Sequence, residues 1–453
     1  MAGLRGSLAR ILPDIGWRKI MDLSDRLPRR SAATIGQLRD QEIAKFRNLC
    51  SGLEWAAINE SGVIYSTPSE SAQLRNLFHH SDATVHALNR SAISANVLRG
   101  WVIVSRDLAG RRRDLAEAVG IRILEVGSKS EPLEPNALDF PGPVDLVYTW
   151  VDAADSEWRK NRNRAVREQD EEALPTASDE ARYTSNDELK YSLRSVESFL
   201  PWVNHIYLVT AGQVPTWLNV DHPKMTLVSH EDIFSAVSDL PTFNSHAIES
   251  QIHHIPSLAE HFVYVNDDVF FGRELRPETF FTAAGLARYQ VSDRLFLTDA
   301  INGLPVNVAA QNNADLLRRR FGAIATLKFK HVAHALRKSV LEQIEAENSD
   351  AVAMTASARF RSHTDLSVPS SLAHHYGALL GKAVPGCATY KYIDLGSAQA
   401  QVELAKTFWS DRQQMMCLNQ VSGPISDLGR QMKMAVHFLE KMYPWQSSFE
   451  RDN

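Results

Sequence analysis

Two hydrophobic patterns alternate along most of the chain. Continuous runs of Val, Ile, Leu, Tyr and Phe are typical of strands buried on both faces of a sheet. Six such runs are WVIVSRD (Trp101–Asp107), IRILEV (Ile121–Val126), DLVYTWV (Asp145–Val151), HIYLVTAG (His205–Gly212), MTLVSH (Met225–His230) and FVYVNDD (Phe262–Asp268). Between them, DELKYSLRSVESFL carries one apolar helical stripe that ends before Pro201, and HAIESQIHHI predicts a second helix. This alternation predicts an α/β fold with a largely parallel sheet and right-handed crossovers.

The pattern divides the chain into two predicted domains. Residues 1–140 form an N-terminal α/β accessory region of βαβ type, in which the helix LAGRRRDLAEAVG separates two strands. The stretch SKSEPLEPNALDFPGPV holds four prolines and few apolar residues, as linkers do. Residues 141–453 form the second domain, which is mainly helical from about residue 285. Residues 155–190 are dense in charges of both signs, which predicts a mobile loop or a solvated helix.

Composition narrows the function classes. The 453 residues are 44% hydrophobic and 23% charged, as in ordinary globular proteins, and the net charge of −5 gives no footprint for nucleic acid. Three cysteines without a C-x-x-C pair favour a reducing compartment, so we expect a cytoplasmic protein. No uninterrupted apolar run reaches the ~18 residues of a membrane span. Residues 8–20 fit either a basic amphipathic helix on the inner face of a membrane or a helix packed on its own domain.

The strand Phe262–Asp268 carries the most informative chemistry. It ends in two adjacent carboxylates, Asp267 and Asp268, at the edge where open α/β sheets bind ligands. Such aspartates hold a divalent ion against the phosphates of a nucleotide or nucleotide-sugar. Successive strand residues point to opposite faces, so the two share a site only if the strand stops between them. The alternative is a strand-end turn with solvated acids.

From Asp145 onward the chain resembles the Stealth family, in four regions in the family's order. They are DLVYTWVDAAD; the long block from ELKYSLRSVESFLPWVNHIYLVTAG through LPTFNSHAIESQIHHIP to FVYVNDDVFFG; KHVAHALRKSVLEQI with ARFRSHTD; and CLNQ, placed near 145–155, 187–285, 328–376 and 408–430. Three residues depart from the family pattern. Ala153 stands in place of Gly, Ala333 in place of the Pro of His-x-Pro-His, and Gln420 in place of the Asp that ends CLND, which leaves any acidic role at that position in doubt.

The resemblance implies a GT-A-like nucleotide-sugar fold and transfer of sugar-1-phosphate rather than of the sugar alone. The donor would be a nucleotide-sugar, UDP-linked by expectation, with Mg²⁺ or Mn²⁺ as cofactor. The acceptor would be a hydroxyl of a polysaccharide in capsule or exopolysaccharide synthesis, and a nucleoside monophosphate would leave. A metal-dependent glycosyltransferase releasing a nucleoside diphosphate is the first alternative, and a non-catalytic nucleotide-sugar sensor is the second. Donor sugar, acceptor and oligomeric state stay open.

The resemblance also assigns roles to single residues. Asp268 would bind the metal. Asp267 would be a second ligand or part of a structural turn, and Asn419 would be a further ligand or a helix cap. Glu249 would be a site residue or a buried ion-pair partner, and it shares a helical face with His246 and His253. Asp145, which opens its strand, would lie near the nucleotide or cap the strand.

Phosphoryl transfer also needs a proton acceptor and a cation for the developing charge. His331 would be the general base, with His334 as the alternative, and Arg361 would face the phosphate, with Arg359 competing for that role. Asn244 and Ser245 would bind a phosphate or sugar hydroxyl, or simply cap the following helix.

Two further polar sets are candidates for binding. Arg194 and Asn186 are additional nucleotide or phosphate candidates. The histidines at 253, 254, 374 and 375 have no partner Cys or His at the spacing of structural zinc sites, so the sequence does not predict zinc.

Overall fold

The computed structural model describes residues 33–53, 55–88, 93–94, 96–109, 117–127, 136–168, 187–295, 305–409, 413–420 and 428–451. The predicted N-terminal amphipathic segment, part of the predicted linker and Asn186 lie outside these ranges. In this described part of the chain, no helix is both long enough and apolar enough to cross a lipid bilayer.

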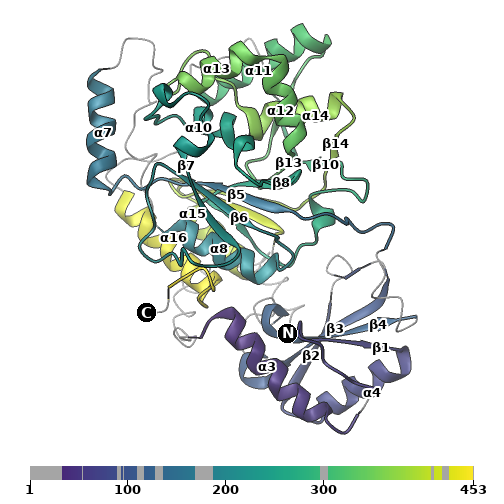
Figure 1. Cartoon of the computed structure of the whole chain (residues 1–453). Helices are drawn as coiled ribbons and strands as arrows, with labels where there is room; N and C mark the ends of the chain where they lie inside the picture. Colours follow the sequence, from purple (N-terminus) through teal and green to yellow (C-terminus); the bar gives the residue numbers. More distant parts are fainter. Residues whose placement is uncertain are drawn as a thin grey trace.

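An N-terminal unit lies at the bottom of Figure 1. Its four-stranded sheet has the order β1-β4-β3-β2, from the strands β1 (Val63–Ser66), β2 (Ala83–Ala87), β3 (Val97–Ser105) and β4 (Ile121–Val126). It carries the helices α3 (Ile35–Cys50), α4 (Pro68–His79) and α5 (Arg106–Ala109). Helix α3 begins at a capping box. The Thr34 hydroxyl accepts a hydrogen bond from the backbone nitrogen of Gln37, and the side-chain oxygen of Gln37 accepts one from the backbone nitrogen of Thr34.

The βαβ prediction for this unit is wrong in strand direction. The strands β3 and β4 are antiparallel neighbours, with Trp101 opposite Ile123, whereas β1 and β4 are the parallel pair. Burial on both faces predicts a strand but says nothing about its direction, which depends on how the connection packs. The N-terminal unit packs against the rest of the chain, because its residues Ile35, Leu38 and Val104 belong to the same hydrophobic core as residues of the central sheet.

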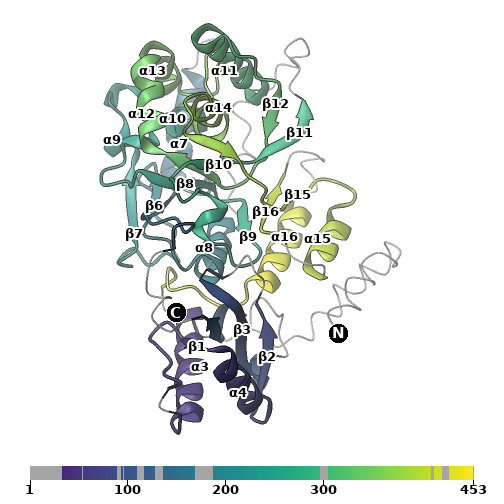
Figure 2. The ribbon, with the colours of Figure 1, turned by 90° about the vertical axis from the view of Figure 1, so that its right-hand side faces the viewer.

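A five-stranded sheet of order β13-β8-β5-β6-β7 forms the centre of the molecule (Figures 1 and 2). The strands β5 (Asp145–Thr149), β6 (Ile206–Thr210), β7 (Met225–Ser229) and β8 (His261–Asn266) are all parallel, and β13 (His334–Arg337) is the antiparallel edge. The α/β fold with a largely parallel sheet is therefore confirmed. The antiparallel edge comes from the part of the chain where the sequence predicted mainly helices.

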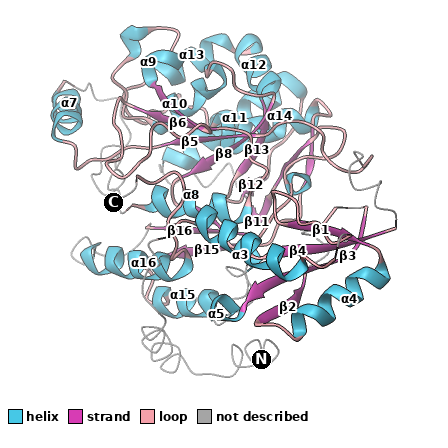
Figure 3. Ribbon diagram, turned by 60° about the horizontal axis from the view of Figure 1, so that its bottom comes forward, coloured by secondary structure: helices cyan, strands magenta, loops and turns pink. Residues whose placement is uncertain are grey.

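Helices cover both faces of this sheet, as Figure 3 shows. Alternate strand residues such as Leu146 and Val263 face a core shared with α8 (Glu188–Phe199), α15 (Ala400–Trp409) and α16 (Leu428–Met442). Val147 and Phe262 face the opposite core. That core includes α9 (His230–Ile233), α10 (Ser245–Gln251), the 3-10 turn η6 (Ile252–His254), α11 (Pro305–Phe321), α12 (Lys338–Glu347), α13 (Ser349–Ser357), the π-helical turn η8 (Val368–Leu372) and α14 (Ala373–Leu379).

A three-stranded sheet of order β15-β16-β9 continues from the end of β8. It contains β9 (Val269–Phe271), β15 (Tyr390–Asp394) and β16 (Met415–Asn419). Figure 2 shows β9, β16 and β15 on one side of β8, and β6 and β7 on the other. Two short pairs complete the strands, β10 (Ala287–Tyr289) with β14 (Ala383–Pro385) and β11 (Val291–Leu295) with β12 (Leu327–Phe329).

The charged stretch after β5 is a helix where it is described. Helix α7 (Ser156–Arg167) begins at Asp155, whose carboxylate accepts from the backbone nitrogens of Glu157 and Trp158. The short 3-10 turns η5 (Val237–Asp239) and η7 (Pro277–Thr279) lie in connections between the larger elements.

Candidate functional site

Asp267 and Asp268 are the two residues that join β8 to β9. Strand β8 ends at Asn266, so both aspartates lie beyond the pleat of the strand and are free to share one site. The backbone carbonyl of Asp268 accepts from the Leu418 nitrogen at 3.0 Å, which fixes the turn against β16. The turn therefore lies at the carboxyl edge of the parallel sheet, where ligands bind in this class of fold.

Asp268 is the centre of a polar cluster. Its Oδ1 lies 3.3 Å from Nε2 of His331. Its Oδ2 accepts from Nδ2 of Asn419 at 3.1 Å and from Sγ of Cys417 at 3.3 Å. Four residues from three distant stretches of sequence thus meet at one carboxylate, and three of them are residues that the sequence singled out.

Sequence reasoning missed Cys417. The signal was available, because Cys417 precedes Asn419 by two residues in β16 and alternate strand residues share a face. Burial raises the pKa of the Cys417 thiol well above its usual value, and the nearby carboxylate of Asp268 raises it further. The thiol is therefore a neutral donor to Asp268.

The electrostatics of the cluster favour a cation. Partial burial raises the pKa of Asp267 well above its usual value, and the carboxylates of Glu188 and Asp268 raise it further. For His331, burial lowers the pKa, but Asp268, Glu249 and Asp267 outweigh burial, so the net shift is upward. Ligand atoms of Asp268, His331 and Cys417 lie within 4.8 Å of one another. Asp268 offers this group carboxylate oxygens, the ligand type that hard divalent cations prefer.

Glu249 of α10 belongs to the same neighbourhood. Tyr264 of β8 donates its hydroxyl to Oε1 of Glu249 at 3.1 Å, and Thr149 at the end of β5 lies 2.9 Å from the same hydroxyl. Glu249 is among the charges that raise the pKa of His331. The Glu249 carboxylate is thus held by Tyr264 of β8, and its charge acts on the histidine that contacts Asp268.

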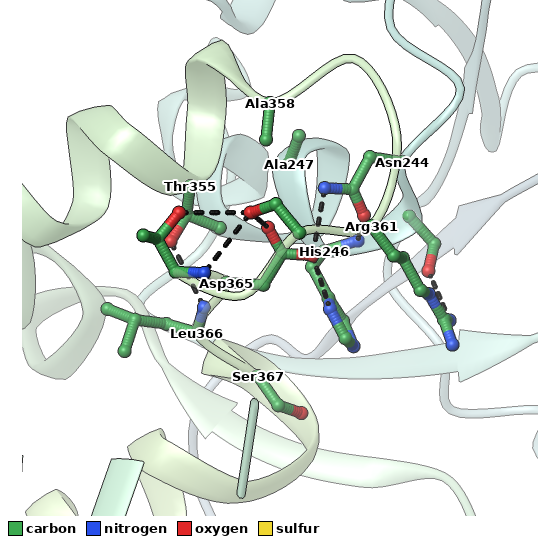
Figure 4. A network of polar contacts seen from close by, with 12 residues as sticks. Asn244, His246, Ala247, Thr355, Ala358, Arg361, Asp365, Leu366 and Ser367 are labelled. Carbon is green, nitrogen blue, oxygen red and sulfur yellow. Dashed lines mark hydrogen bonds and ion pairs between the residues drawn. The ribbon is translucent and has the colours of Figure 1, made fainter. Parts of the chain in front are cut away.

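The beginning of α10 is held by a buried network around Asp365 (Figure 4). Oδ2 of Asp365 accepts a hydrogen bond from Nδ2 of Asn244 at 3.0 Å. The same oxygen lies 3.0 Å from Nδ1 of His246. The side-chain oxygen of Asn244 accepts a hydrogen bond from the backbone nitrogen of His246. Asn244 is therefore the N-cap of α10, one of the two roles that the sequence allowed. Asp365, in the FRSHTD segment, was not assigned a role from the sequence.

Arg361 reaches the same helix. Its Nη2 donates to Oγ of Ser245 at 2.8 Å, whereas Arg359 lies 3.6 Å from the carboxylate of Glu168. Ser245 and Glu249 are four residues apart in α10 and therefore share a face, about 6 Å apart along the axis. The structure thus brings Arg361, rather than Arg359, to the face of α10 that carries Glu249.

His334 and His374 form a buried pair behind His331. Nδ1 of His334 lies 2.9 Å from Nε2 of His374, and Nε2 of His334 has no hydrogen-bond partner among the described residues. Burial lowers the pKa of both rings, that of His374 to about 3, and each ring is further disfavoured as a cation by a neighbouring histidine. The pair is neutral, and His331 is the histidine that contacts Asp268.

Two predicted site residues lie elsewhere. Asp145 opens β5, so the length of the strand separates it from Thr149, and its carboxylate accepts from the Ala259 nitrogen and from Asn204. This is the strand-start cap that the sequence left open. Arg194 donates to both oxygens of Glu450 and to the carbonyl of Tyr443, which occupies all three of its nitrogens. Neither residue is brought to Asp268.

A second cluster of ligand-type residues lies where η6, which follows α10 directly, packs against α12. Helix α10 ends at Gln251, and His253 and His254 in η6 each place Nε2 2.8 Å from Oε2 of Glu345 on α12. These two histidines hold the pKa of Glu345 down to about 2. Because Glu345 is 91 residues beyond His254 in sequence, spacing between Cys and His residues could not reveal this group.

Three family models match the chain. Stealth protein conserved region 1 matches residues 142–170, conserved region 2 residues 182–289 and conserved region 3 residues 330–378. These regions contain Asp267, Asp268, Glu249, His331 and Arg361.

Two curated relatives illustrate the similarity. Exopolysaccharide phosphotransferase SCO2594 of Streptomyces coelicolor is 46% identical over 314 residues, which are 68% of this chain and 52% of that protein. Exopolysaccharide phosphotransferase CpsY of Mycobacterium tuberculosis is 41% identical over 328 residues, 70% of this chain and 60% of that protein. The chain thus spans between about half and three fifths of these relatives' length.

Solved structures give only weak likenesses. The galactosyltransferase LgtC, in complex with donor and acceptor sugar analogues, has a TM-score of 0.34 and 11% identity, covering 65% of this chain and 95% of LgtC. Mouse xyloside xylosyltransferase 1 has a TM-score of 0.26. Likenesses this weak constrain neither the fold nor the activity. The three matched regions, in their order along the chain, together with the identity to both relatives, show that the chain belongs to the Stealth family.

Proposed function

We propose that the chain is a sugar-1-phosphate transferase that acts in capsule or exopolysaccharide synthesis. It moves hexose-1-phosphate from a nucleotide-sugar, which we expect to be UDP-linked, to a hydroxyl of a polysaccharide. A nucleoside monophosphate leaves. Support comes from the family membership, from the names of the two relatives and from the chemistry of the Asp268 cluster.

One observation carries the proposal. Asp268 contacts His331 at the carboxyl edge of the sheet, and Arg361 lies on the Glu249 face of α10. A metal-binding carboxylate, a titratable base and a guanidinium are the groups that phosphoryl transfer needs. A sensor of nucleotide-sugars has no need for a base beside the phosphate.

His331 is the proposed general base, and Asp268 sets its tautomer. Because a carboxylate only accepts, Asp268 holds the proton on Nε2 and leaves the lone pair on Nδ1 to take the proton of the acceptor hydroxyl. Arg361 offers a planar fork to the phosphate oxygens as negative charge develops. When bound to Asp268 and Asp267, Mg²⁺ or Mn²⁺ would neutralise charge on the donor diphosphate.

The test is to identify the nucleotide product. Purified protein is incubated with Mg²⁺ or Mn²⁺, several UDP-sugars and an extract of cell-surface polysaccharide from the organism that encodes the chain. The nucleotides are then separated by ion exchange. UMP that depends on the acceptor is the expected product, and a chelator should abolish it. UDP would instead identify a glycosyltransferase, and the roles of His331 and Arg361 at phosphorus would be withdrawn.

A matched pair of histidine variants tests the base. His331→Ala should abolish turnover but leave the binding of the UDP-sugar intact. His205→Ala is the control, because His205 precedes β6 at the opposite end of the sheet, where its ring contacts Thr226 and Tyr207. Unchanged turnover in His331→Ala would exclude His331 as the base.

A further inference from the structure

A cavity lies one strand beyond the Asp268 cluster. Its volume is about 450 Å³, and it is lined by β15, by the segment that follows β15 and by Arg294 of β11. This volume is within the range of about 300–1,000 Å³ that is typical of small-molecule sites. None of its lining residues has a role in the function proposed above.

The register of β15 and β16 ties this cavity to Asp268. Tyr392 is the partner of Cys417, and Asp394 is the partner of Asn419. Residues paired in neighbouring strands point to the same face, so Tyr392 and Asp394 lie beside the two side chains that contact Asp268. One strand spacing, about 4.8 Å, separates Tyr392 from Cys417.

The side chains of the cavity have the chemistry of a saccharide site. Tyr392 is 40% exposed, which leaves a flat aromatic surface on which the apolar face of a sugar ring can pack. Arg294, Asp394, Ser397 and Glu403 surround it with hydrogen-bonding groups for hydroxyls. Burial raises the pKa of Tyr392, and the nearby carboxylates of Asp394 and Asp268 raise it further, so the phenol is a neutral donor close to the cluster.

The cavity lies on the side of Asp268 away from the expected nucleotide. Ligands of open α/β sheets bind at the carboxyl ends of the parallel strands, at the point where the strand order reverses, here between β5 and β8. The sheet of β9, β16 and β15 extends from β8 in the other direction (Figure 2). A donor placed over β5 and β8 therefore leaves the cavity beside β15 free, and a molecule in the cavity approaches the cluster from the opposite side.

We propose that this cavity is the acceptor subsite, and that it binds a saccharide with one sugar ring packed on Tyr392. Ligand atoms of His331 and Cys417 lie within 4.8 Å of each other, so a saccharide seated on Tyr392 can extend its terminal hydroxyl toward His331. The inference rests on the proposed function for the role of the saccharide as acceptor. The binding of the saccharide itself can be tested without any donor.

The test measures saccharide binding to the full chain by titration calorimetry in the absence of nucleotide. The probes are oligosaccharides released by mild acid from the surface polysaccharide of the organism that encodes the chain. Tyr392→Ala should raise Kd about tenfold or more, equivalent to about 1.4 kcal/mol, because the packing surface is lost. Tyr392→Phe should stay close to the native value, since it keeps the ring.

Controls separate binding from folding. Tyr65→Ala makes the same substitution in β1 of the N-terminal sheet and should not change Kd. Arg294 is exposed on β11, so Arg294→Ala removes a polar group of the cavity with little effect on packing and should also raise Kd. Equal affinity in Tyr392→Ala and the native chain, or no binding to the native chain, would overturn the inference.

Kinetics then distinguish the inference from the proposed function. If UMP is produced, Tyr392→Ala should raise KM for the acceptor while KM for the donor stays unchanged. Binding that depends on Tyr392 without any UMP would support the subsite and reject the transferase. UMP production with an acceptor KM that is insensitive to Tyr392 would do the reverse.

Discussion

The buried pair of Arg194 and Glu450 offers the sharpest test of the structure, because the sequence predicted a different role for Arg194. Nε and Nη2 of Arg194 donate to the two carboxylate oxygens of Glu450 at 2.7 and 2.6 Å, and Nη1 donates to the Tyr443 carbonyl at 2.9 Å. Arg194 is 7% exposed and Glu450 is 6% exposed. The pair joins α8 to the C-terminal segment, so we expect Arg194→Met to destabilise the fold and not to weaken donor binding.

The magnitude follows from what the substitution leaves behind. Breaking a buried ion pair from one side costs about 3–5 kcal/mol, since the remaining charge stays buried without its partner. Glu450 keeps the backbone nitrogen of Ser447 at 2.8 Å and the ammonium of Lys190 at 3.8 Å, so the lower half of that range applies. The double variant Arg194→Met with Glu450→Gln removes both charges. It should lose less than the sum of the two single variants.

The assay is urea denaturation of the native chain, the two single variants and the double variant, with the free energy of unfolding taken from the midpoint and slope. Arg106→Met is the control, because the Arg106–Asp82 pair is 68% and 67% exposed and such pairs contribute about 0–1 kcal/mol. Donor KM is measured below the unfolding temperature. An unchanged midpoint together with a raised donor KM would show that Arg194 binds substrate and that the structural assignment is wrong.

Three further predictions follow from the charges and burial of single side chains. Asp268→Asn should abolish transfer while the fold persists, because the metal ligand and the acceptor of His331 Nε2 are lost; turnover and circular dichroism measure this, and activity near the native level would exclude the metal role. Iodoacetamide at pH 8 should label the exposed Cys387 and spare the buried Cys417, because burial raises the pKa of the Cys417 thiol. Peptide mass spectrometry measures the labelling, and rapid labelling of Cys417 would contradict its burial beside Asp268. Burial lowers the pKa of His230 to about 4 from 6.5, so this neutral ring contributes stability that is present above pH 6.5 and lost as pH falls toward 4, on the order of 3 kcal/mol. His230→Leu should flatten the stability curve between pH 6.5 and 4, and an unchanged slope would refute this.

The central sheet was predictable because its strands are buried on both faces. Runs such as DLVYTWV and FVYVNDD have no polar face, and the sequence places each of them within a few residues of β5 and β8. The antiparallel edge β13 and the direction of β3 against β4 were not predictable in this way. Strand direction depends on the packing of connections, which hydrophobic periodicity does not encode.

Some residues of the site could likewise be identified from the sequence, whereas others depend on contacts between distant parts of the chain. Asp268 could be identified from its place at a strand end, and the resemblance supplied His331 and Glu249. The sequence could not assign Arg194, because its buried partner Glu450 is 256 residues away. Asn244 shows the opposite limit. A cap residue and a ligand-binding residue have the same signature in sequence, and only the contact with Asp365 distinguishes them.

Cys417 and Tyr392 show what strand register adds to residue chemistry. Neither residue is acidic, basic or nucleophilic in its environment, so neither stands out as a candidate for phosphoryl transfer. Cys417 and Asn419 are two residues apart in β16, so their side chains point to the same face, where both contact Asp268. Tyr392 in β15 pairs with Cys417 and therefore points to that face as well. An exposed aromatic ring, an ordinary surface feature by itself, thus lies one strand from Cys417, which contacts the proposed metal ligand Asp268. Its position relative to Asp268, more than its chemistry, makes it the residue whose substitution tests how the acceptor reaches His331.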